Sequence, residues 1–324
     1  MTAPLVAFGV SAAIAAILVT VPALRAPLTR AATGPRWRAD AVPVSGGIAM
    51  AIGFLVAAAM AARGARGLGA IVAASTLLLV MGVVDDLHPL PPIVKLAGHV
   101  VGGVILATFG VHPDLPGGAA VGVIAAVAWF VLVTNAVNLL DGMDGLAGGI
   151  GMIAGVTLWL WNAPAPLAAA FVGAVAGFLP LNLPAARMFM GNGGSHWMGA
   201  MLAGLTLLDG GSAGGTLPGA WASVFVPVVL LAVPLFDTCL VVVERLRHGR
   251  RVTVGGTDHT SHRMVAMGMS EWQTVGSLWL VGLGAAGAAS LIRVGPGAFA
   301  VAGAALAAVL MVLGARLARA RVYD

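Results

Sequence analysis

Long apolar runs recur along this chain, and only short polar segments separate them. A membrane-spanning helix needs about 20 mainly apolar residues. With 60% hydrophobic and 9% charged residues, the 324-residue chain has too few charges to cover a soluble globule of its size. The sequence therefore predicts an all-α fold, a polytopic integral membrane helical bundle of about 11 transmembrane helices. The runs lie near 4–24, 46–62, 68–84, 93–110, 119–138, 146–162, 166–184, 197–209, 219–243, 273–292 and 297–315.

The basic residues indicate how these runs are oriented. If the N-terminus lies outside, 14 of the 17 Lys and Arg residues fall in cytoplasmic segments, and only Arg63, Arg66 and Arg293 lie outside. Such an asymmetry is typical of the positive-inside rule. We therefore expect an external N-terminus, a cytoplasmic C-terminus and a multi-pass protein of the inner (plasma) membrane. The rule also explains the basic balance without a nucleic-acid partner.

No linker or internal repeat divides the chain. We expect one transmembrane domain over 1–324. Its functional site would be formed by cytoplasmic loops near 25–45, 85–95, 139–148, 182–196 and 244–272.

Acidic residues gather on the predicted cytoplasmic side. Asp85 and Asp86 follow the third run, and Asp141 and Asp144 follow the fifth run in DGMDG. Adjacent carboxylates raise each other's pKa and concentrate at functional sites. Membrane proteins also keep charges in loops, and DGMDG alone could be an ordinary turn. Together, carboxylates and glycine-rich backbone suit Mg²⁺ that carries phosphate.

A histidine-containing segment, GGTDHTSHR, follows the ninth run and several arginines. Neutral histidine can bind a metal, but His259 and His262 lack convincing further ligands for zinc. An anion such as a diphosphate is favoured as the partner. Lys95, the only lysine, could contact phosphate or Asp86, or it could extend to the membrane interface.

Five ordered segments resemble one enzyme family. They are the GG of PVSGG, the DD of VDDL with Lys95 following, NAVNLLDGMDGL, LNLPAARMFMG, and PLFDT followed by GGTDHTSHR. The chain resembles the polyprenyl-phosphate N-acetylhexosamine-1-phosphate transferases (glycosyltransferase 4 type). It is most similar to the undecaprenyl- and decaprenyl-phosphate N-acetylglucosamine-1-phosphate branch. The muramoyl-pentapeptide branch typically carries a run of histidines where this chain has DHTSHR.

The resemblance implies an enzyme that transfers N-acetylhexosamine 1-phosphate from a UDP-sugar to polyprenyl phosphate. For this branch the sugar would be N-acetylglucosamine. The products would be a polyprenyl-diphosphate sugar and UMP, and the reaction would initiate cell-envelope glycan synthesis. Mg²⁺ is the implied cofactor, with Mn²⁺ as an alternative. The partners would be the two substrates and the lipid bilayer, and a homodimer is compatible with the sequence.

The resemblance also implies roles for particular residues. The implied catalytic residues are Asp85, Asp86, Asp141 and Asp144, and the implied metal ligands are Asn192, Asp86 and Asp144. Phe189 would stack on uracil, although an isolated Phe is more often a core residue. His259, His262 and Arg263 would clamp the diphosphate, and Asp237 would support the site. The implied substrate-binding residues are Lys95, Asn135, Asn138, Asn182, Phe189, Asp258, His259, His262 and Arg263.

Asn192 departs from the family's pattern. The segment FMGNGGSHWMG, which we expect to form a flexible polar turn before the eighth run, holds Asn192 where the family has an aspartate metal ligand. An amide oxygen can coordinate Mg²⁺ but lacks the carboxylate's charge. The asparagine could be introduced to trap substrates, tolerated because nearby aspartates hold the metal, or a sign of a catalytically impaired binding homologue.

Two further alternatives concern the class of activity. One is a UDP-MurNAc-pentapeptide phosphotransferase, which the same motifs would also serve. The other is a lipid or solute transporter. Transporters usually place functional acids near the bilayer midplane, in broken helices. The acids of this chain lie at the ends of apolar runs, which favours surface chemistry over transport.

Overall fold

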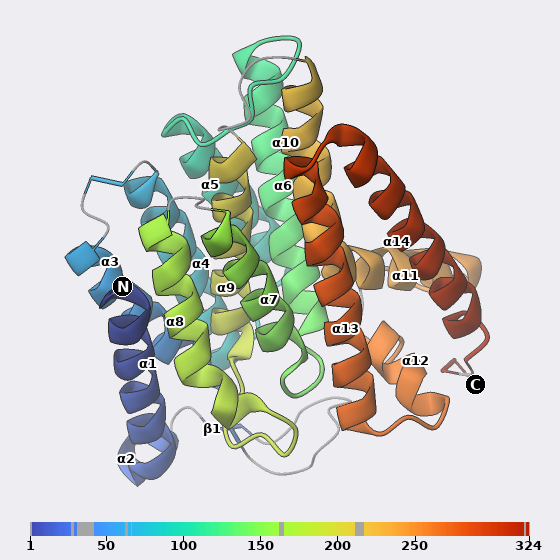
Figure 1. Ribbon diagram of the computed structural model, residues 1–324. Coiled ribbons are helices and arrows are strands. Elements are labelled where there is room, and N and C mark those ends of the chain that lie inside the picture. The colour runs from blue at the N-terminus through green and yellow to red at the C-terminus, as the bar shows by residue number, and fades with distance from the viewer. Residues whose placement is uncertain are drawn as a thin grey trace.

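The computed structural model describes residues 2–26, 29–30, 42–61, 64–65, 67–161, 165–210, 217–253, 255–320 and 322–323. Each predicted apolar run forms helix within these residues, which confirms the all-α class. Most of the long helices run side by side (Figure 1). The first half contains α1 (Thr2–Thr20), α2 (Pro22–Arg25), α3 (Gly46–Ala61), α4 (Leu68–Leu87), α5 (Pro92–Thr108), α6 (Ala119–Leu140) and α7 (Leu146–Leu160). The second half contains α8 (Ala165–Asn182), α9 (Gly191–Gly210), α10 (Leu217–Leu230), α11 (Ala232–Arg247), α12 (Thr260–Ala266), α13 (Glu271–Ser290), the 3₁₀ turn η3 (Leu291–Arg293) and α14 (Pro296–Leu317).

Six helices of the described residues are long and apolar enough to cross a membrane, namely α1, α4, α6, α8, α13 with η3, and α14. The pair α10 and α11 would add a seventh span if it is counted as one. Helices α3, α5 and α7 are apolar but shorter. The chain is therefore a polytopic membrane protein built of helices.

The predicted ninth run is not one straight helix. Residues 222–230 of α10 and helix α11 meet at Leu231 with a bend of 79°. Pro234 lies in the first turn of α11, where it has no N–H to donate to the carbonyl of Leu230. The missing donor weakens the helix at this point, and α11 turns away from the direction of α10.

Helix α9 begins earlier than the sequence predicted. The expected flexible turn over Phe189–Gly199 is wrong, because the helix starts at Gly191 and includes Asn192. Its first turn packs closely on α3 and α4. A Cβ on Gly47 would lie 2.3 Å from backbone atoms of Gly194, and a Cβ on Gly193 would lie 2.7 Å from Val83. Glycine is required here by close helix packing.

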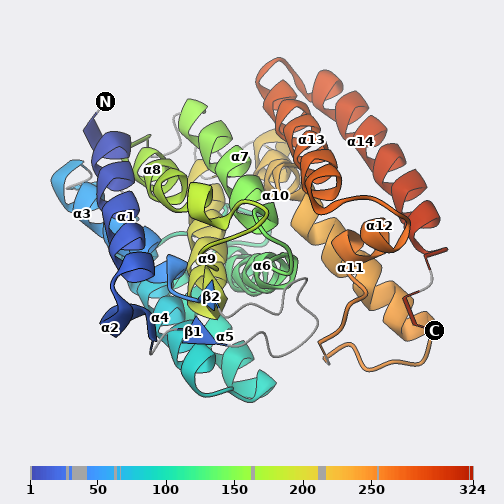
Figure 2. The same cartoon turned by 90° about the horizontal axis from the view of Figure 1, so that it is seen from below.

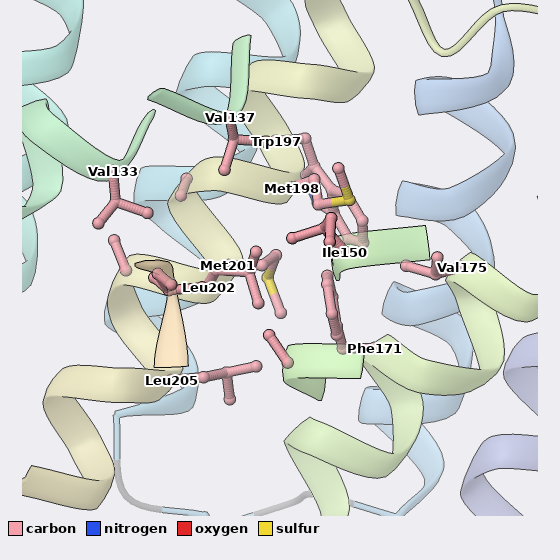
Figure 3. Packing of buried hydrophobic residues seen from close by; sticks show 14 of the residues in the cluster. Val133, Val137, Ile150, Phe171, Val175, Trp197, Met198, Met201, Leu202 and Leu205 are labelled. Carbon is pink, nitrogen blue, oxygen red and sulfur yellow. The ribbon is translucent and has the colours of Figure 1, made fainter. Parts of the chain in front are cut away.

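The core of the bundle surrounds α9. Figure 2 shows this helix between α4, α6, α7 and α8, and Figure 3 shows the packing of its apolar side chains. Trp197 and Met201 are almost fully buried against Val133 of α6, Ile150 of α7 and Phe171 of α8. This contact surface positions the first turn of α9 relative to the neighbouring helices.

Most of the predicted cytoplasmic loop 25–45 lies outside the described residues. Its ends form strands β1 (Thr29–Arg30) and β2 (Val42–Pro43), which pair antiparallel. Strand β2 continues into α3 beside the segment that precedes α9, since the Phe189 N–H donates to the Pro43 carbonyl (2.9 Å).

Candidate functional site

The predicted site segments meet at one end of the bundle. The connection between α6 and α7, the strand pair and α12 all lie toward the lower end of Figure 1. The first turn of α9 faces the same end, because its backbone bonds to the last turn of α4. The structure therefore brings together most of the polar segments that the sequence singled out.

Asp86 caps the N-terminus of α9. It occupies the last turn of α4, and its two carboxylate oxygens accept hydrogen bonds from the backbone N–H groups of Asn192 (3.0 Å) and Gly193 (3.1 Å). The first N–H groups of a helix have no partner inside the helix, and negative charge is favoured there. This side chain, 106 residues away in sequence, explains why α9 begins within a glycine-rich segment.

Asp85 pairs with Lys95. The Lys95 ammonium lies 3.1 Å from one carboxylate oxygen of Asp85, and the Leu90 N–H donates to the other at 2.7 Å. The prediction that Lys95 could meet Asp86 is therefore replaced by a contact with Asp85. The Lys95 side chain is 31% exposed and that of Asp85 only 4%, so the ammonium is the member of the pair that an incoming anion can approach.

Asn192 belongs to an amide cluster formed by α6 and α9. Nδ2 of Asn138 donates to Oδ1 of Asn192 (3.2 Å) and to the Ser195 hydroxyl (2.8 Å). One turn earlier on α6, Nδ2 of Asn135 contacts Nδ1 of His99 (2.9 Å). Asn135, Asn138 and Asn192 are each half-buried, which leaves polar atoms near the surface of the bundle end.

The DGMDG turn connects α6 and α7 and is fastened to the segment before α9. Oδ2 of Asp144 accepts from the Ala186 N–H (2.9 Å). Asn182 accepts from the Gly145 N–H (3.2 Å) and donates to the Met188 carbonyl (3.0 Å). Asp141 and Asp144 are in the turn rather than in a helix. Asn182 is buried and links the DGMDG turn to the segment before α9.

Phe189 is fixed by its backbone. Its N–H bonds to Pro43, and its carbonyl accepts from the Gly46 N–H (3.0 Å), while its ring is only half-buried. A half-buried ring at the bundle end can stack on a planar group. The alternative of a fully buried core Phe does not apply in this structure.

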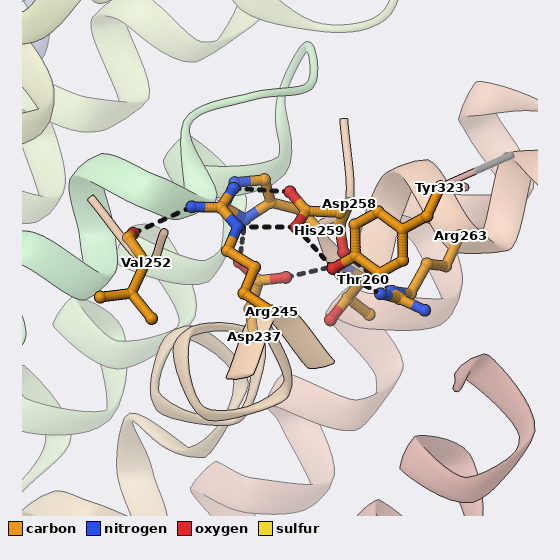
Figure 4. A network of polar contacts seen from close by, with 8 residues as sticks. All are labelled: Asp237, Arg245, Val252, Asp258, His259, Thr260, Arg263 and Tyr323. Carbon is orange, nitrogen blue, oxygen red and sulfur yellow. Dashed lines mark hydrogen bonds and ion pairs between the residues drawn. The ribbon is translucent and has the colours of Figure 1, made fainter. Parts of the chain in front are cut away.

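A cluster of charged side chains, the Arg245–Asp258 cluster, connects α11 with the segment before α12 (Figure 4). Asp237 accepts from Nδ1 of His259 (2.8 Å) and from the Thr260 N–H (2.6 Å), so it caps α12. Asp258 accepts two bonds from Arg245, at 2.7 and 2.6 Å. This is the bidentate geometry of strong arginine–carboxylate pairs.

Arg263 is fully buried in this cluster. It donates to the carbonyls of Asp258 (2.8 Å) and Leu317 (3.1 Å) and to the Tyr323 hydroxyl (3.2 Å). Leu317 ends α14, and a cation at a helix C-terminus is favourable. The sequence predicted Arg263 as a diphosphate clamp, whereas its guanidinium here binds protein groups and joins α12 to α14.

The charges of this cluster follow from its contacts. Burial alone would raise the pKa of Asp258, but the hydrogen bonds from Arg245 and Tyr323 outweigh it and lower the pKa to about 2. Burial alone would lower the pKa of His259, yet the hydrogen bond to Asp237 and its charge keep the pKa above the ordinary value of 6.5. Asp258 is therefore anionic, and His259 is more readily protonated than a free histidine.

His262 connects the Arg245–Asp258 cluster with the DGMDG turn. Its Cε1 lies 3.5 Å from the point that a Cβ on Gly142 would occupy. The histidine segment and the carboxylate turn, far apart in sequence, are thus neighbours. Sequence reasoning gave Ser195 no role within FMGNGGSHWMG, and it missed His99 and Tyr323, which belong to none of the motifs. Arg245 was noted only as one of several nearby cations, although its pairing with Asp258 organises the segment.

The proposed metal ligands have suitable chemistry for Mg²⁺. Asp86, Asp144 and Asn192 offer only oxygen donors, which Mg²⁺ prefers. Within the described part of the chain, no group of three or more His, Cys, Asp or Glu side chains could hold a metal by itself. Magnesium sites that carry phosphate commonly use one or two carboxylates and complete the shell with phosphate and water. The residues present fit that kind of site.

Comparison with known proteins supports the same reading. Residues 68–209 match the family described as glycosyl transferase family 4. A decaprenyl-phosphate N-acetylglucosaminephosphotransferase of Mycolicibacterium smegmatis is 32% identical, covering 83% of this chain and 77% of the relative. A probable undecaprenyl-phosphate N-acetylglucosaminyl 1-phosphate transferase of Bacillus subtilis is 30% identical over 74% and 70% of the two chains.

A third relative represents the other branch. A phospho-N-acetylmuramoyl-pentapeptide-transferase of Limosilactobacillus fermentum is 32% identical, but over only 58% of this chain and 60% of the relative. The N-acetylglucosamine relatives therefore match a larger share of the chain. The family match covers α4 to α9, which carry Asp85, Asp86, the DGMDG turn and Asn192. By its ordered motifs, helical bundle and similarity to these relatives, the chain belongs to glycosyl transferase family 4.

Proposed function

We propose that the chain transfers N-acetylglucosamine 1-phosphate from UDP-N-acetylglucosamine to polyprenyl phosphate and releases UMP. The observation that carries the proposal is the similarity to transferases named for this activity over most of the chain. The gathering of the Asp85, DGMDG and histidine segments at one end of the bundle supports it. The reaction would start the assembly of a cell-envelope glycan.

The proposed site lies on the cytoplasmic face of the inner membrane. Eleven spans with an external N-terminus would put every predicted site segment on that face, where the basic residues also gather. One substrate is soluble and the phosphate of the other lies at the membrane surface. Reaction at the surface lets both reach the same residues. A homodimer remains a prediction from the sequence.

In the proposed reaction, an oxygen of the lipid phosphate forms a bond to the β-phosphorus of the UDP-sugar. The bond from that phosphorus to the oxygen that leaves with UMP breaks. The chain's task is to position two anions and to offset their charge. Lys95, which Asp85 orients and which is partly exposed, suits the lipid phosphate. Asp85 would accept a proton from that phosphate if it arrives protonated.

The UDP-sugar would bind between the DGMDG turn and α12. Asp141, Asn135 and Asn138 would orient the nucleotide and sugar, and the half-buried ring of Phe189 would stack on uracil. His259 and His262 would contact the diphosphate. Arg263 is buried and bonded to protein groups, so we assign it and Asp258 a positioning role.

Asp86, Asp144 and Asn192 would hold Mg²⁺. When bound, the ion would neutralise negative charge on the diphosphate. Asp86 also fixes the backbone of Asn192, so its carboxylate serves the fold of the site even without the ion. Asn138 orients the Asn192 amide by donating to its oxygen.

The test is release of UMP by purified protein in detergent or nanodiscs. Reactions would contain UDP-N-acetylglucosamine, polyprenyl phosphate and Mg²⁺, with controls that omit the acceptor or add a chelator. We expect acceptor-dependent UMP release and formation of a lipid-linked diphosphate sugar. Release only from UDP-MurNAc-pentapeptide would move the chain to the other branch. Tight donor binding without release from any UDP-sugar would identify a binding homologue.

A further inference from the structure

Tyr323 lies where three parts of the chain meet. Its hydroxyl donates to Oδ2 of Asp258 (2.8 Å) and accepts from Nη2 of Arg263 (3.2 Å). Asp258 precedes His259, and Arg263 belongs to α12. The only tyrosine of the chain, which follows α14, is therefore bonded to the first and the last residue of DHTSHR (Figure 4).

The Tyr323 ring holds the loop that follows α11. The guanidinium carbon of Arg250 lies 4.4 Å from the ring centroid, and the His248 ring, tilted by 48°, has its centroid 4.7 Å away. Nη2 of Arg250 also donates to the Tyr323 carbonyl (3.1 Å). A guanidinium over an aromatic face is attracted by the ring and keeps unused donors at its edge. Tyr323 thus fixes Arg250 while leaving some of its N–H groups available.

A basic pocket of about 340 Å³ lies beside this ring. Arg250, Arg251, Gly255, Gly256, Thr257 and Tyr323 contribute to its wall. The charge of Arg245, which also lines it, is matched by Asp258. Arg250 and Arg251 are exposed, so the pocket keeps positive charge for a ligand. Guanidinium groups favour the oxygens of phosphate.

We propose that Tyr323 is a positioning residue for binding of the donor's diphosphate, because it holds Arg250 at this basic pocket and Asp258 next to His259, which we assign to the diphosphate. The inference rests on the proposed function and deepens it. The side chain of Arg245 anchors Asp258 from α11, and its carbonyl accepts the backbone N–H of Arg250 (2.8 Å). The guanidinium of Arg250 is held by Tyr323. Tyr323 is the group that connects Arg250, Asp258 and Arg263 at once.

Direct binding tests the proposal without requiring turnover. UDP-N-acetylglucosamine and, separately, inorganic diphosphate are titrated by calorimetry into the full chain and into Tyr323→Ala, Tyr323→Phe and Arg250→Ala. We expect Tyr323→Ala to weaken both ligands about tenfold, as loss of hydrogen bonds to charged groups predicts. Tyr323→Phe, which keeps the ring over Arg250, should lose less. Arg250→Ala should resemble Tyr323→Ala.

The matched control is Arg247→Ala, which removes a nearby exposed cation that does not line this pocket. Its donor affinity should stay within about twofold, and polyprenyl-phosphate binding should be unchanged in every variant. Unchanged donor affinity in Tyr323→Ala would overturn the proposal, as would equal loss of donor, acceptor and thermal stability in Tyr323→Phe. If the unmodified chain binds inorganic diphosphate but not the UDP-sugar, the proposed function fails. Tyr323-dependent diphosphate binding would then still support the pocket, and its absence would refute it.

Discussion

The carboxylate of Asp86 receives the backbone N–H of Asn192 at 3.0 Å, across 106 residues of sequence. The last turn of α4 thereby ends against the first turn of α9. The residue that departs from the family's pattern is thus held by a neighbouring family aspartate. Asp86 holds the backbone of Asn192, and Asn138 donates to its side-chain oxygen.

Asp86→Asn should destabilise the protein by about 1–2 kcal/mol, the usual range for loss of a helix cap. The amide offers one acceptor where two N–H groups need one each, and the charge at the helix end is lost. Thermal or denaturant unfolding in detergent measures the effect. Asp85→Asn is the control, since it weakens the Lys95 contact but leaves α9 capped. Equal stability of Asp86→Asn and the unmodified protein would exclude the capping role.

Asn192→Asp should raise the rate of UMP release and make it depend more steeply on Mg²⁺. The carboxylate can still accept from Asn138, and it adds a negative charge to the proposed metal site. A carboxylate in the first turn of a helix is also favourable for stability. Rates measured over a Mg²⁺ series for both forms check this. Identical rates and identical Mg²⁺ curves would show that residue 192 does not ligate the ion.

The helices were predictable because their signal is local. Length and composition predict each apolar run, and Pro234 is a readable cause of the break between α10 and α11. The start of α9 was not predictable from its own residues, since glycines on both sides of Asn192 normally indicate a turn. The N-terminus of α9 is capped by Asp86 of α4, and no residue pattern within α9 predicts this cap.

The candidate site was predictable only in part, for the same reason. Motif order indicated that Asp85, Asp144 and His262 belong to one site, and the structure brings their segments to one end of the bundle. The hydrogen-bond partner of each side chain could not be predicted from the sequence. Tyr323 bonds Asp258 across 65 residues, and Arg263 is a buried connector whose position next to His262 suggested a ligand-binding group.

Gly47→Ala should destabilise the bundle by about 3 kcal/mol or prevent its folding. The added Cβ would lie 2.3 Å from the backbone of Gly194, so α3 and the first turn of α9 would have to separate. Unfolding temperature and yield of folded protein measure the effect. Gly276→Ala in α13 meets nothing within 4 Å and should be neutral or slightly stabilising. Similar behaviour of both variants would contradict the close contact of α3 and α9.

The ion pair of His259 with Asp237 predicts a particular pH dependence of stability. The folded-state pKa of His259 lies above its ordinary value of 6.5. A raised pKa means that the folded state binds the proton more tightly than the unfolded state. The stabilisation is therefore fully present below pH 6.5 and is lost as pH rises through the folded-state pKa.

His259→Gln removes the titrating group but keeps a hydrogen-bond donor for Asp237. Its unfolding temperature should fall furthest below that of the unmodified protein at about pH 6, and the difference should shrink toward pH 9. Asp258, whose pKa is about 2, stays ionised throughout this range, so its charge does not contribute to the pH dependence. A difference that grows with pH would mean that His259 is stabilised in its neutral form, with Asp237 acting only as the cap of α12.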